Sequence, residues 1–146
     1  MRLRNKKPPL LILAMLLLSI PAQAASDEVF AERGKLVAAR DIQFRDRADG
    51  GVDVFNAATG ELIEALQPNS HNFIRALMRG LVRQRVRESK GADIPFHLAA
   101  WSEGELILDD PATNRSVELT AFGPTNAGDF VEMLPLHRLP APGDKP

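Results

Sequence analysis

Histidine is the side chain best suited to acid–base chemistry in this sequence, and there are three: His71, His97 and His137. Nucleophilic catalysis needs a Ser, Thr or Cys held by such a base close to a carboxylate. None of the three lies in a nucleophile elbow or an H-x-x-x-H spacing, and the chain has no cysteine. The sequence therefore predicts no enzyme and no bound cofactor or metal, and it favours solvated or structural roles for the histidines.

Three carboxylates, Asp46, Asp49 and Asp53, gather around the first predicted hairpin and invite comparison with a calcium site. Their spacing is not the D-x-D-x-D-G pattern of a calcium-binding loop, and no glutamate closes the loop. This cluster is therefore predicted to be a polar turn.

Four arginines recur at intervals of four along one predicted helix: Arg75, Arg79, Arg83 and Arg87. At this spacing they form a slowly winding row beside the apolar arc of the helix. Neighbouring like charges repel by a few tenths of a kcal/mol per pair, and no acidic residue occurs between 72 and 87. We interpret the row either as a solvated face or as a surface for a partner protein or anionic lipid headgroups. Arg85 and Lys90 are expected to add to its charge.

Trp101, the single tryptophan, ends a predicted strand. A tryptophan at such a place is more often the edge of a core than a binding residue, but aromatic side chains are enriched in interfaces. Trp101 is therefore a second candidate for partner binding.

The composition predicts one globular domain that does not bind nucleic acid. Four of the 18 basic residues precede the first apolar run, so the remainder of the chain has 14 basic and 19 acidic residues. With 146 residues, 45% of them hydrophobic, the chain has room for one ordinary core and a short leader.

Residues 1–26 have the three parts of a secretory signal: a basic start, an apolar run from Leu10 to Ile20, and Ala22-Gln23-Ala24 as a cleavage pattern. The uncharged stretch 8–26 is also close to the length of a membrane-spanning helix, although Pro21 disfavours a helix there. A cleaved signal and a retained anchor both remain open. Either one places the rest of the chain outside the cytoplasm, on the periplasmic side of the inner membrane.

The rest of the chain nearly repeats itself at a spacing of 54 residues, so that Ile42 corresponds to Phe96 and Gly50 to Gly104. In the first half, short alternating apolar runs separated by glycine turns predict a three-stranded meander. A helix should follow and run to about Ser89, capped by Ser70 or Asn72, with Gly91 placed to end it.

In the second half the predicted strands are 96–101, 105–109 and 116–122, followed by a helix over about 126–134. Asn114 is expected to take a left-handed conformation in the turn before the third strand. The expected core positions are Phe44, Val54, Leu98 and Leu108.

The sequence thus predicts an α+β fold of βββα-βββα order, a pseudo-symmetric single domain built from two copies of one meander and helix. The domain should span residues 38–135, with repeats at about 40–91 and 94–135 and a flexible Pro-rich tail at 136–146. The alternative is one continuous six-stranded sheet, or a small barrel, with helices at its edges.

Several ordered blocks of the sequence resemble the photosynthetic complex assembly proteins of purple bacteria, the PuhC-like family. They are R-D-I-Q-F-R-D-R-A-D-G-G-V at Arg40–Val52, F-I-R-A-L-M-R-G-L-V-R-Q-R at Phe73–Arg85, P-F-H-L-A-A-W at Pro95–Trp101 and D-P-A-T-N-R-S-V-E-L-T-A-F-G-P-T-N-A at Asp110–Ala127. Ordered blocks with the right spacing are far more specific than a single motif.

This resemblance implies a non-enzymatic, membrane-associated factor that assembles the photosynthetic reaction centre with its core light-harvesting antenna. Subunits of those complexes would be its partners, and Arg75, Arg79 and Arg83 match the family's basic helix. The resemblance supplies no catalytic residues. The alternative function is a periplasmic envelope-binding module that recognises anionic lipid or glycan.

Overall fold

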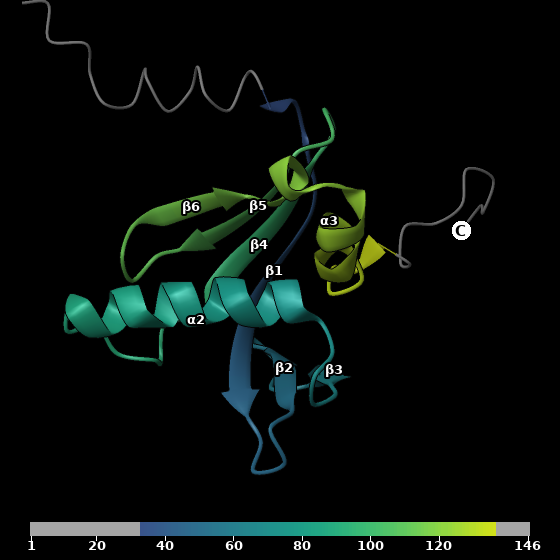
Figure 1. Ribbon diagram of the computed structural model, residues 1–146. Helices are drawn as coiled ribbons and strands as arrows, with labels where there is room; N and C mark the ends of the chain where they lie inside the picture. The colour runs from purple at the N-terminus through teal and green to yellow at the C-terminus, as the bar shows by residue number, and fades with distance from the viewer. Residues whose placement is uncertain (1–32, 137–146) are drawn as a thin grey trace, which may run out of the picture.

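The computed structural model describes residues 33–136, which form one six-stranded antiparallel sheet with helices (Figure 1). The sheet order is β3-β2-β1-β4-β5-β6. The α+β class is confirmed, and the sheet is continuous, as in the second architecture that the sequence left open. The strands are β1 (Leu36–Asp46), β2 (Val52–Asn56), β3 (Leu62–Leu66), β4 (Phe96–Trp101), β5 (Leu106–Asp110) and β6 (Arg115–Glu118).

Predictions for both ends of the chain fall outside these residues. They concern the signal or anchor at 1–26, His137, and the tail from 137 onward.

Strands β1, β2 and β3 pair in chain order, and so do β4, β5 and β6. The two sets join where β1 pairs with β4, with Ile42 opposite Phe96. The segments that follow the two sets differ in form. Helix α2 (Asn72–Arg87) follows β3, whereas a 3₁₀ helix, η1 (Leu119–Phe122), and the shorter α3 (Pro124–Val131) follow β6. A duplicated, pseudo-symmetric unit stays a prediction.

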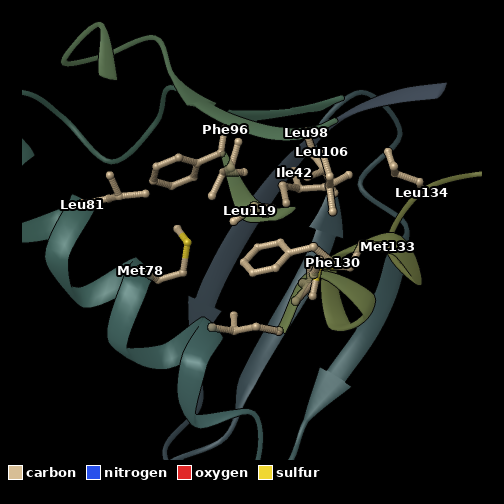
Figure 2. Close-up of a cluster of buried hydrophobic side chains, with 14 of the residues drawn as sticks. Ile42, Met78, Leu81, Phe96, Leu98, Leu106, Leu119, Phe130, Met133 and Leu134 are labelled. Atoms are coloured by element: carbon tan, nitrogen blue, oxygen red, sulfur yellow. The ribbon is translucent and has the colours of Figure 1, made fainter. Parts of the chain in front are cut away.

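Both α helices of residues 33–136 cover one face of the sheet, and the main core lies between the layers. Figure 2 shows Met78 and Leu81 of α2 and Phe130 of α3 directed toward the sheet residues Ile42 and Phe96. Because side chains alternate along a strand, one residue in two faces this layer. Three of the four predicted core positions, Val54, Leu98 and Leu108, are buried, with 0 to 1% of their surface exposed. The fourth, Phe44, is partly buried and packs against the core.

Helix α2 lies close to its predicted range, but the predicted capping residues were wrong at both ends. His71 occupies the N-cap in a left-handed conformation, and neither Ser70 nor Asn72 caps the helix with its side chain. At the other end Ser89 takes the left-handed position expected of glycine, with φ of 55°. The amide of Lys90 then donates to the carbonyl of Arg85 at 2.8 Å, which satisfies a helix-end carbonyl as a Schellman motif does. The helix therefore ends before Gly91.

In the second half, β4 matches its prediction, but the third strand stops at Glu118 instead of continuing to Phe122. The chain turns there into η1, which places Leu119 fully in the core. Helix α3 begins at Pro124 instead of Asn126, because proline is preorganised for the first turn of a helix. Asn114 is left-handed, with φ of 53°, as predicted.

Candidate functional site

Helix α2 presents two faces of different chemistry. Ile74, Met78 and Leu81 are buried against the sheet, and this arc leaves the row of four predicted arginines outside the core. Figure 1 shows α2 lying across the strands of the sheet.

Arg75 holds the start of α2 in place. Its guanidinium donates to three carbonyl oxygens: from Nε to Ser70 at 2.8 Å, from Nη2 to Gln67 at 2.7 Å and from Nη1 to Gly50 at 2.9 Å. These bonds join the helix to the loop before it and to the first hairpin. Arg75 is half-buried, so we assign it a positioning role in the row.

The other members, Arg79, Arg83 and Arg87, are exposed. Arg79 and Arg83 each donate from Nε to the carbonyl four residues earlier, both at 3.2 Å, and Arg87 donates to the side chain of Gln84. Within residues 33–136 none of the three forms an ion pair with a carboxylate. The carboxylates of the described residues therefore do not neutralise this part of the helix by ion pairing.

Arg85 does not extend the exposed charge, which corrects the sequence-based expectation. It is 3% exposed and pairs with Asp110, which is 0% exposed, at 2.7 Å from Nη2 to Oδ1. Its Nη1 donates to the carbonyl of Ile94 at 2.8 Å, and its guanidinium carbon lies 3.9 Å from the ring centroid of Phe96. Arg85 thus ties α2 to β5 and to the segment before β4.

Burial alone would raise the pKa of Asp110, but hydrogen bonds outweigh it. Arg85, the hydroxyl of Thr113 and the amide of Ala112 all donate to this carboxylate, and the pKa of Asp110 lies below its ordinary value. A lowered pKa means that Asp110 adds stability above its ordinary pKa, and that this stability is lost as the pH falls through the lowered value.

A groove of about 470 Å³ runs between α2, the C-terminal half of β1 and the segment 90–96. Its walls are mostly apolar, and they include Phe44, Ile74, Met78, Val82, Val86 and Ile94. Arg75, Arg79, Arg83 and Lys90 also line it. The structure therefore places three of the four predicted arginines around one hollow, whereas Arg87 lies beyond it on the exposed end of α2.

Trp101 is half-buried at the far end of β4 from this groove. Phe96, at the start of the strand, lines the groove, and five residues of strand rise separate the two by about 17 Å. The two candidate surfaces are therefore distinct.

The two described histidines have structural neighbours. His97 Nδ1 lies 2.7 Å from Asp41 Oδ1, with both side chains partly exposed, and His71 Nδ1 lies 2.9 Å from the hydroxyl of Ser70. No cluster of three or more potential metal ligands occurs between residues 33 and 136. Over the same range no helix has the length and apolar character needed to span a bilayer.

The acidic hairpin is a polar turn, as predicted, and the structure adds that Arg47 pairs with two of its carboxylates. Arg47 lies 2.8 Å from Asp49 and 3.1 Å from Asp53, and the amide of Gly51 donates to Asp49 at 2.8 Å. The hydrogen bonds from Arg47, and then from Gly51, lower the pKa of Asp49 to about 2.

We expect Asp49 to titrate by carbon NMR near pH 2 instead of its ordinary 3.8, because the folded state favours the charged carboxylate. The stability that it contributes is present above pH 3.8 and is lost as the pH falls toward 2. Arg47→Gln should move the midpoint back toward 3.8. An unchanged midpoint in that variant would contradict this assignment.

The fold and the groove define a small α+β domain with a basic helix beside an apolar surface hollow. Residues 37–138 match the family described as Photosynthetic complex reorganisation protein PuhC. This range holds more than half of the chain, and the chain therefore belongs to that family. Searches of curated proteins and of solved structures found no match.

Proposed function

We propose that this protein is a non-enzymatic assembly factor for the photosynthetic reaction centre and its core light-harvesting antenna. The observation that carries the proposal is the family match over residues 37–138, which includes α2, α3 and all but the first residue of the sheet. Reorganisation of a photosynthetic complex requires contact with its subunits.

The contact surface that we assign is the exposed part of the arginine row, Arg79, Arg83 and Arg87, with Arg75 holding the helix that bears it. Arginine is enriched at interfaces because its planar guanidinium pairs well with carboxylates. Trp101 is assigned to a second contact at the other end of β4.

We place the domain at the periplasmic face of the inner membrane. The support is the order of the first 24 residues, in which basic residues precede an apolar run and an Ala-x-Ala pattern. Basic residues stay on the cytoplasmic side, so the chain after the apolar run lies on the opposite side.

Deleting the gene for this chain from its host should lower the absorbance of the reaction centre and core antenna while pigment synthesis continues. The reason is that an assembly factor acts after its subunits and pigments have been made. Absorption spectra of membranes from cells grown with low oxygen provide the measurement, and the wild-type gene on a plasmid is the control.

Normal membrane spectra and normal growth by light in the deletion strain would refute this function. The periplasmic module for anionic lipid or glycan would then be the better account, because the exposed arginine row lacks carboxylate partners within residues 33–136.

A further inference from the structure

The walls of the groove beside α2 expose more apolar surface than the fold requires. Val82 and Val86 on the helix are 49% and 70% exposed, and Ile94 across the groove is 42% exposed. Phe44 and Met78 line the same hollow and pack into the core. Apolar side chains gathered around a hollow, with a polar rim, mark a place where a ligand or partner binds.

The size of the groove suits a small ligand. Its volume of about 470 Å³ lies within the roughly 300–1,000 Å³ of ordinary small-molecule sites. From Met78 to Val86 the helical wall is about 12 Å long, at 1.5 Å per residue. A narrow apolar chain can lie against this wall over that length, with the remainder of a longer chain extending beyond it.

The charge around the groove indicates which head group a bound apolar ligand would carry. Arg79, Arg83 and Lys90 line it without carboxylate partners in the described residues, and Asp46 is its one acidic lining residue there. Arg85 adds no net charge because Asp110 neutralises it. An occupant with an apolar body and an anionic head complements both the walls and the rim.

We propose that this groove binds a long-chain anionic amphiphile with a single chain, of the fatty-carboxylate type. Its chain lies against Val82, Val86 and Ile94, and its head group pairs with Arg79 and Arg83. The leader of the protein itself is a poorer occupant, since its apolar run follows the basic residues 2–7, which the arginines repel. This ligand goes beyond the proposed assembly role, although its site shares Arg79 and Arg83 with the contact surface assigned above.

The test uses the full-length purified chain and a palmitate analogue that carries a diazirine on its acyl chain. After illumination, the label should be concentrated in peptides from residues 78–94, and unlabelled palmitate should compete for it. The uncharged hexadecanol should compete about two- to thirtyfold less well, because two exposed ion pairs together contribute about 0.4 to 2 kcal/mol.

Val82→Trp, which fills the groove, should reduce the labelling at least about tenfold, the ratio that 1.4 kcal/mol of lost binding produces. Val131→Trp is the matched control, because Val131 is 37% exposed on α3 and does not line the groove. Ala92→Trp fills the hollow from its other wall and is used if Val82→Trp does not fold.

The double variant Arg79→Gln/Arg83→Gln should lose the preference for palmitate over hexadecanol, whereas Arg115→Gln on β6 should keep it.

Equal labelling of wild type, Val82→Trp and Ala92→Trp would overturn the proposal. So would binding to phosphatidylglycerol vesicles without palmitate labelling, which would indicate headgroup contact at the rim alone. Labelling displaced by core-complex subunits but not by palmitate would indicate a protein occupant and would also overturn it. None of these results depends on the gene-deletion phenotype, so the two proposals fail separately.

Discussion

Replacing Asp110 by Ala is expected to lower the free energy of unfolding by about 3–5 kcal/mol, because it leaves the Arg85 guanidinium buried without its counter-charge. Arg85 is 3% exposed and donates three hydrogen bonds to this carboxylate, at 2.7 to 3.1 Å. The amide of Ala112 and the hydroxyl of Thr113 lose their acceptor as well. Urea denaturation of the purified chain provides the measurement.

The control is the double variant Asp110→Ala/Arg85→Met, which removes both charges and retains an unbranched apolar side chain. It should recover a large part of the loss, since replacing a whole buried ion pair costs far less than removing one partner. A double variant that is as unstable as the sum of the two single variants would show that the pair does not act as a unit.

Leu98→Ala is expected to cost about 2–5 kcal/mol, because it opens a cavity in the tightly packed layer between sheet and helices. Leu98 is 0% exposed and lies opposite both Arg40 and Leu108 in the sheet. Chemical denaturation again provides the measurement.

Leu62→Ala is the matched control, since it removes the same atoms from an edge strand where the side chain is 49% exposed. It should change the stability by about 0.5 kcal/mol or less, as surface substitutions usually do. Equal losses in the two leucine variants would contradict the position of the core.

The strands and the core were predictable because period-two alternation is a local signal that burial on one face enforces. Val54, Leu98 and Leu108 follow this rule. The ends of α2 were not predictable in the same way, since non-glycine residues, His71 and Ser89, take the left-handed positions there. Arg75 holds the start of the helix in a different way from a capping side chain, because it donates to carbonyl oxygens of the preceding loop instead of accepting from the first helical amides.

The buried position of Arg85 could have been predicted from the sequence. It lies four residues after Leu81, and Ile74, Met78, Leu81 and Arg85 continue one helical spacing. An arginine on the buried arc of a helix requires a buried carboxylate, and Asp110 supplies it from a strand 25 residues away. Its place in a run of basic residues concealed this role, because the identical charges suggested a single exposed surface.

The groove could not be predicted from the sequence, because it depends on tertiary geometry. Strand β4 begins opposite Ile42, so the part of β1 after Ile42 is not paired with β4. The segment before β4 lies across the groove from α2 instead. The sequence did predict the arginine row, and the structure adds that three of its members line an apolar hollow.

Affinity purification of the tagged full-length protein from gently solubilised host membranes tests the central claim most directly. The account predicts that reaction-centre and core-antenna subunits are recovered with the wild-type protein and with Arg115→Gln. It also predicts that they are largely lost with the triple variant Arg79→Gln/Arg83→Gln/Arg87→Gln. Recovery of these subunits no greater than from an untagged strain, under conditions in which the tagged protein restores the deletion strain, would contradict assembly through direct contact.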